Sequence, residues 1–192
     1  ITITTTSLTI KPQQNMVYGF NAEWKFLPRF TLNSDFQKSA YTADMRDSAP
    51  AVGGSAWKQE LKYKGGLVGA RAALSQVDAN FASFASPSVI ADRRTLDGEF
   101  AVYPAEWETF TLGFNSYSDN LDGDAAKTTT EQTQTTIANT LRIRGTTLVN
   151  TSLTSNATKG KPASVQDNQT TTMNMSVTQP WGAHTLNLGY QL

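Results

Sequence analysis

Apolar and polar residues alternate with a period of two along most of the chain, as in β-strands that have one apolar and one polar face. The clearest case is residues 16–26, where Met16, Tyr18, Phe20 and Trp24 fall on one side and mostly polar or small residues on the other. The alternation recurs, more weakly in the first and eighth of these segments, at 1–10, 30–37, 57–64, 68–75, 96–102, 109–115, 137–144, 147–154, 172–177 and 185–192. The sequence therefore predicts an all-β protein of about 11 to 12 strands.

Short turns and long polar loops separate these strands in alternation. The short turns, at 26–29, 64–66, 103–106, 144–146 and 179–182, are about 40 residues apart, the length of two strands and one long loop. The long loops are rich in Asp, Asn, Gly, Ser and Pro and cover 39–54, 80–93, 118–132 and 155–169. This rhythm predicts an antiparallel up-and-down meander whose two ends meet different surroundings, as a transmembrane β-barrel requires.

Strand length and aromatic placement favour a bilayer over a soluble core. The predicted strands have about ten to thirteen residues, whereas strands of soluble proteins cluster near five or six and membrane-crossing strands need about nine to eleven. Aromatic residues gather beside the short turns, as in the girdle at a membrane surface: Trp24, Phe26, Phe30, Tyr63, Tyr103, Trp107 and Trp181. The alternative is a soluble β-sandwich or fibre subunit, in which the same apolar faces would form a core.

These features together resemble the Gram-negative outer-membrane β-barrel class, in particular its porin-like proteins. The terminal residues Tyr190 to Leu192, preceded by Leu186 and Leu188, look like the C-terminal insertion signal of that class, although the class usually ends in an aromatic residue. The resemblance implies a single barrel domain over residues 1–192, embedded in outer-membrane lipid. It also implies an even strand number with both ends in the periplasm.

The count of eleven identified segments departs from this pattern and leaves three alternatives. One strand is missed, or the chain is the C-terminal part of a larger barrel, or other chains complete the wall. Those other chains would be an envelope partner or further copies of this one. Backbone groups at an open sheet edge cannot reach water inside hydrocarbon, so the sheet must close or be completed.

Composition narrows the chemistry. Lysine plus arginine equals aspartate plus glutamate, so charge gives no reason to expect nucleic acid as a partner. Cysteine is absent, which excludes disulfides and thiolate metal sites within these residues. The single histidine, His184, and the lack of a nucleophile motif indicate no enzyme and no cofactor. The acidic segment Asn120 to Asp124 lacks a complete set of calcium ligands and is predicted to be a solvated turn.

The polar sides of the predicted strands carry the residues expected to face the lumen: Glu23, Arg29, Lys58, Glu60, Lys62, Arg71, Asp97, Glu99, Arg142 and Arg144. In a wide barrel such residues line water and set ion preference, whereas in a narrow one they pair and fill the interior. The expected function is a porin-like channel or pore wall for passive passage of small solutes. The alternative is a structural barrel that anchors or sheaths a partner in an envelope assembly.

Overall fold

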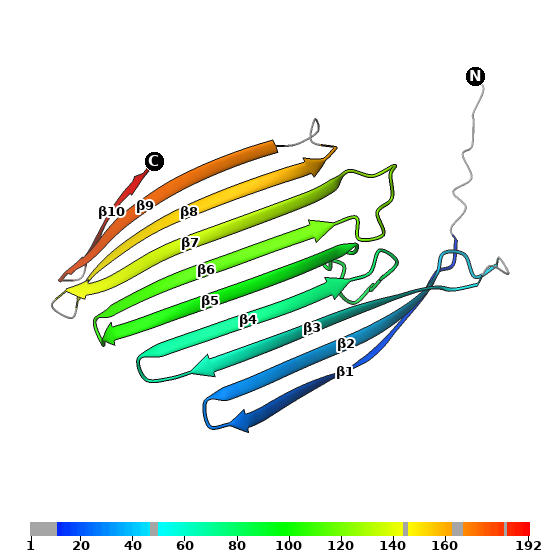
Figure 1. The fold of residues 1–192 in the computed structure, drawn as a ribbon, viewed down its shortest axis with the longest axis horizontal. Coiled ribbons are helices and arrows are strands. Elements are labelled where there is room, and N and C mark those ends of the chain that lie inside the picture. The colour runs from blue at the N-terminus through cyan, green and yellow to red at the C-terminus, as the bar shows by residue number, and fades with distance from the viewer. Residues whose placement is uncertain (1–10, 47–49, 144–145, 163–166, 183) are drawn as a thin grey trace, which may run out of the picture.

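A computed structural model describes residues 11–46, 50–143, 146–162, 167–182 and 184–192, and they form one antiparallel sheet of ten strands (Figure 1). Each strand pairs with its neighbours in the sequence, so the predicted all-β meander is confirmed. The eleventh segment, expected in residues 1–10, lies outside the described residues. The strands are β1 (Gln14–Leu27), β2 (Phe30–Thr42), β3 (Val52–Lys64), β4 (Val68–Val77), β5 (Arg93–Ala105), β6 (Glu108–Asp119), β7 (Thr129–Ile143), β8 (Thr147–Lys161), β9 (Asp167–Trp181) and β10 (His184–Gln191).

The sheet is open. Within the described residues, β1 pairs only with β2 and β10 only with β9, and the two strands lie at opposite margins of the sheet (Figure 1). The closed barrel expected from the sequence is therefore not the arrangement of this chain by itself. The short turns gather at one end of the strands and the long loops at the other, as the rhythm of the sequence predicts (Figure 1). The described residues contain no helix long and apolar enough to cross a membrane.

Several strands run further into the predicted loops than expected. β8 covers all of residues 147–154, the segment with the weakest alternation, and continues to Lys161. Threonine suits a pleated strand, and paired threonines support one another across strands. The hydroxyls of Thr136 on β7 and Thr154 on β8 are 3.2 Å apart, in keeping with that pairing. At the short-turn end of the sheet, β5 continues through Ala105, so the turn between β5 and β6 begins later than predicted.

The pairing register converts the alternation into a continuous apolar face. One residue from each of β1 to β9, together with the residue that follows β10, falls in a single row that crosses the sheet. Every member is apolar or aromatic: Leu27, Phe30, Tyr63, Ala70, Phe100, Leu112, Ile137, Leu153, Met173 and Leu192. We call the side that bears this row the apolar face and the other side the polar face.

The exposure of apolar and polar side chains is the reverse of that in a soluble protein. On the apolar face Trp24 is 63% exposed and Leu112 is 47% exposed, whereas on the polar face Glu60 is 8% exposed. Among the described residues only Ala73, Phe81 and Ala101 are buried apolar residues, so this sheet has no hydrophobic core. The chain exposes 13564 Å², compared with ~9,000 Å² for a compact soluble monomer of this mass.

Candidate functional site: the polar face of the sheet

The register gathers seven of the predicted lumen residues on the polar face of the first five strands. Asn33 pairs with both Glu23 and Glu60, and Ala73 pairs with both Glu60 and Asp97, so the three acidic residues share one row. The neighbouring row on the same face contains Lys62, Arg71 and Glu99, and Lys58 lies nearer the long loops.

The other three predicted lumen residues are not part of this group. Arg29 lies in the turn between β1 and β2. Arg142 lies near the short-turn end of β7, on the polar face but away from the acidic row. Arg144 lies outside the described residues.

Glu60 is the centre of the charged group. Its carboxylate accepts hydrogen bonds from the Lys62 ammonium at 2.7 Å, from the Arg71 guanidinium at 3.1 Å and from the Asn33 amide at 3.1 Å. These donors come from three neighbouring strands, so the carboxylate ties β2, β3 and β4 together. Charge-assisted bonds of this kind are stronger than neutral ones, and they compensate a carboxylate that is almost fully buried.

Charge is unevenly distributed across the polar face. The first five strands carry the acidic and basic residues described above. On β6 to β10 the polar face consists mainly of Thr, Ser, Asn and Gln, with Asp119 and Arg142 near strand ends as its charged residues. The polar face therefore divides into a charged part on β1 to β5 and a neutral hydrogen-bonding part on β6 to β10.

The β4–β5 loop crosses the polar face at the long-loop end. We call its residues 78–86 the strap. Asn15 of β1 donates its side-chain amide to the carbonyl of Ala82 at 2.8 Å and accepts the backbone N–H of Phe84 at 3.1 Å. Ser39 of β2 accepts the backbone N–H of Ala82 at 3.1 Å. The strap thus reaches from the end of β4 to β1, three strands away.

Packing contacts also hold the strap on the sheet. Phe81 is buried, and the backbone of Asn80 and Phe81 lies so close to Gly54 of β3 that a Cβ at that position would collide with it. The ring of Phe84 meets that of Tyr41 edge-on, with centroids 5.8 Å apart. At the start of the strap, Asp78 accepts hydrogen bonds from the backbone N–H and the hydroxyl of Ser55, which lower the pKa of its carboxyl.

Two adjoining hollows lie on the polar face beside the strap. One, of about 490 Å³, is bounded by Ser83 and Ser86 of the strap and by Asn21 and Asp35 of the sheet. The other, of about 280 Å³, shares Asn21 and Asp35 and continues to Glu23, Lys58 and Glu60. A groove therefore leads from beneath the strap to the charged group.

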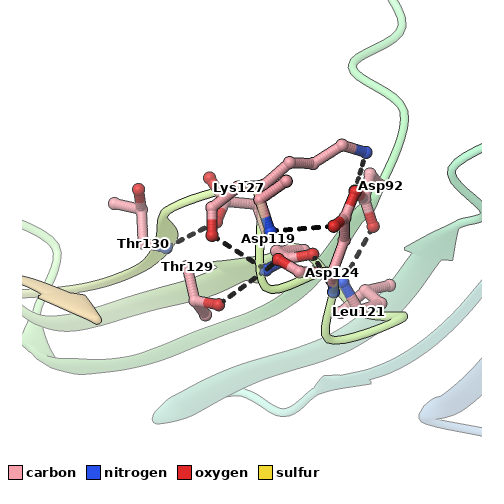
Figure 2. A network of polar contacts seen from close by, with 9 residues as sticks. Asp92, Asp119, Leu121, Asp124, Lys127, Thr129 and Thr130 are labelled. Carbon is pink, nitrogen blue, oxygen red and sulfur yellow. Dashed lines mark hydrogen bonds and ion pairs between the residues drawn. The ribbon is translucent and has the colours of Figure 1, made fainter. Parts of the chain in front are cut away.

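The acidic segment between β6 and β7 forms a hydrogen-bonded loop (Figure 2). Asn120 is buried, and its amide donates to the carbonyl of Asp124 at 3.0 Å and to the hydroxyl of Thr129 at 2.9 Å. Asp92, from the β4–β5 loop, accepts the backbone N–H of Leu121 at 2.8 Å, which joins the two loops. The carboxylates here cap backbone groups, and no described cluster of three acidic or histidine side chains is placed to hold a metal ion.

The predicted aromatic girdle is partly assembled at the first hairpins. Trp24, Phe26, Phe30 and Tyr63 form a chain of ring contacts with centroid distances of 5.2, 5.6 and 4.8 Å. Trp107 and Trp181 are exposed beside later short turns. Tyr103 differs, because its side chain approaches Gly69 of β4 and lies on the polar face.

Sequence reasoning missed the strap and its anchors, Asn15, Ser39 and Phe81. The sequence does contain an indication of the strap, because the β4–β5 loop is more apolar than a solvated loop usually is. Its apolar residues are Phe81, Phe84, Val89 and Ile90. A scan against protein-family models finds no match for this chain, and no curated protein matches its sequence.

Proposed function

We propose that this chain forms the wall of a β-barrel in a bacterial outer membrane and that its polar face lines a passage for small solutes. In this role the apolar face contacts lipid and the polar face contacts water. The protein is not an enzyme and acts without a cofactor. The observation that carries the proposal is the slant of the apolar band across the sheet.

The band of apolar residues does not run parallel to the rows of paired residues. On β1 it extends from Met16 to Leu27, and its centre lies about five residues to the long-loop side of the apolar row. On β10 it extends from Leu186 to Leu192, and its centre lies about three residues to the short-turn side. The centre therefore shifts by about one residue per strand.

This shift corresponds to a strand tilt typical of membrane barrels. A displacement of one residue, ~3.4 Å, for each strand spacing of ~4.8 Å gives a tilt of about 35°. Strands of outer-membrane barrels tilt by about 35–45°, because the apolar band must stay level with the bilayer while the strands cross it obliquely. A soluble sheet has no such requirement, and among the described residues no second layer covers the apolar face.

The polar face fits a restricted aqueous passage. Its groove leads from the strap to Glu60 and Lys58, so a passing solute would meet both a steric limit and fixed charges. The decisive experiment is to refold the purified chain into detergent and planar bilayers. We expect heat-modifiable gel migration and discrete conductance steps. A protein that stays soluble and folded without detergent contradicts the proposal.

A structural role is the second candidate, and the strap favours it because it already occupies part of the polar face. In that case the barrel would anchor or sheath an envelope partner. A chain that inserts into bilayers, shows heat-modifiable migration and yet conducts no ions would support this role over the channel.

A further inference from the structure

Two opposite charges on the polar face have no protein partner within the described part of the chain. Asp35 on β2 and Lys58 on β3 are paired across the two strands, yet no ion pair within 4.0 Å and no side-chain hydrogen bond joins either of them to another described group. Both residues line the hollow of about 280 Å³ on the polar face. Asp35 is half-buried there, and Lys58 is exposed.

The other two carboxylates of this hollow already have cationic partners. Glu23 forms an ion pair with Lys25 at 2.9 Å. Glu60 binds the Lys62 ammonium and the Arg71 guanidinium, as described above. Among the described lining residues, the charges left for a ligand are therefore one carboxylate and one ammonium, which together are neutral.

The backbone pairing keeps these two side chains apart. The N–H of Lys64 donates to the carbonyl of Arg29 at 2.9 Å, so these two residues form a hydrogen-bonded pair of β2 and β3. Such pairs recur at every second residue, so Asp35 and Lys58 form a hydrogen-bonded pair as well. In pairs of this kind the Cα atoms are ~5.5 Å apart, compared with ~4.5 Å in the intervening pairs. The two charges therefore leave a gap between them that is open to the hollow.

A small solute that carries both charges matches this gap. Its carboxylate would accept from the ammonium of Lys58, and its ammonium would donate to the carboxylate of Asp35. Asn21, which pairs with Asp35 from β1, supplies a neutral amide at the same place. A solute with a single charge would satisfy only one of the two groups. The hollow is also several times larger than the ~30 Å³ that one water molecule occupies, so it has room for a small organic molecule.

We propose that the hollow over β1, β2 and β3 binds a free α-amino acid, with Lys58 on its carboxylate and Asp35 on its ammonium. The three strands pair with one another in sequence order, so the site is complete within them. The inference rests on the proposed function, because it names the class of solute that the passage would favour.

Ligand titrations of the unmodified chain, refolded in detergent, test the site. Glycine is the probe, and NMR chemical shifts of Asn21, Asp35 and Lys58 report binding. Acetate and methylammonium each carry one of the two charges of glycine, and triglycine carries both at a wider separation. We expect saturable shifts with glycine and about fivefold weaker binding of each of the other three, since each would lose one charged contact.

Substitutions that remove one charge each assign the two contacts. Asp35→Asn and Lys58→Gln should each weaken glycine binding about fivefold. In Asp35→Asn glycine should bind no better than acetate, and in Lys58→Gln no better than methylammonium. Lys38→Gln is the matched control, because Lys38 lies on β2 on the apolar face, and this variant should bind glycine as the unmodified chain does.

Three results would overturn the inference: no saturable glycine binding, equal binding of glycine and a singly charged solute, or equal binding of glycine and triglycine, which would indicate peptides instead. Should a substitution impair folding, the ligand series on the unmodified chain decides alone. Failure of the site is distinct from failure of the proposed function. A chain that inserts and conducts without binding glycine would reject the site alone, whereas a chain that binds glycine but stays soluble and folded without detergent would reject the proposed function alone.

Discussion

At the scale of single residues, the polar face separates paired from unpaired charges. Lys62 is bound to Glu60 at 2.7 Å, whereas no ion pair within 4.0 Å joins Lys58 to a carboxylate among the described residues. The two lysines lie on the same strand and the same face, four residues apart. They therefore form a matched pair for separating an effect on ion preference from an effect on folding.

Replacing either lysine with a neutral residue should shift ion preference toward cations, but only one replacement should disturb the sheet. Lys58→Gln should change the free energy of unfolding by less than about 0.5 kcal/mol. Lys62→Gln should destabilise by about 0.5–1 kcal/mol, because it removes a charged hydrogen-bond donor from Glu60. Reversal potentials in planar bilayers and urea titrations measure the two effects. Unchanged reversal potentials for both variants would contradict a lumen position.

A second ion pair at this scale lies in the β2–β3 loop and should respond to acid. Hydrogen bonds from Arg46 lower the pKa of Asp44 from its ordinary value of 3.8 to about 2. Because the folded pKa is the lower one, the stabilisation is complete above about pH 4 and is lost as the pH falls toward 2. An NMR titration of the Asp44 carboxyl should show this low pKa, and Arg46→Gln should return it toward 3.8. Lys11→Gln should have a smaller effect, since that ammonium is 3.8 Å away.

At the scale of elements, the strap is the segment that a meander does not require. A hairpin loop needs only to connect its two strands, yet the β4–β5 loop reaches β1 and β2 through Asn15 and Ser39. Gly54 permits this approach because it has no side chain. The strap therefore depends on a position in another strand and can be altered without changing the loop.

Adding one methyl group at Gly54 should displace the strap. Gly54→Ala places a Cβ against the backbone of Asn80 and Phe81 and should destabilise the protein by about 1–3 kcal/mol. It should also raise conductance and expose the loop to proteases. Gly53→Ala is the control, because its Cβ would lie 3.6 Å from the nearest atom, the carbonyl oxygen of Ser39. Equal behaviour of the two variants would show that the strap is not held at Gly54.

At the scale of the whole molecule, the two faces of the sheet are suited to two different solvents. The apolar row crosses the sheet without a charged member. Most of its residues are exposed: Leu27, Phe100, Leu112, Ile137, Leu153, Met173 and Leu192. This arrangement is unfavourable in water and favourable in hydrocarbon. The same substitution should therefore be tolerated at one position of a strand and strongly destabilising at the next position, which lies on the other face.

A lysine on the apolar face should prevent stable insertion, and one on the polar face should not. Leu112 lies near the middle of the apolar band, and Leu112→Lys should cost about 2–4 kcal/mol in lipid. Thr111→Lys, one residue away on the polar face, should be tolerated within about 0.5 kcal/mol. Unfolding of vesicle-bound protein by denaturant measures both. Equal destabilisation by the two substitutions would argue against hydrocarbon on the Leu112 side.

The sequence was sufficient for strands and faces because these depend on local alternation. Phe20, Trp24, Leu112 and Leu188 fell on the predicted side because a period of two survives small errors in strand ends. The apolar residues of the β4–β5 loop indicated some burial, but where the strap lies could not be predicted, since the burial of Phe81 depends on Gly54, which is far away in the sequence. Whether the sheet is open or closed could not be predicted either, because the alternation of apolar and polar residues is the same in an open sheet and a closed barrel.

The neighbour-to-neighbour order of the strands also has a kinetic consequence. Every pairing in the sheet joins segments that are adjacent along the chain, so contact order is low and each hairpin can add to the one before it. Such growth is a first-order process within one molecule. Refolding of the sheet should therefore show a phase whose rate does not depend on protein concentration, measured by stopped-flow fluorescence at several concentrations.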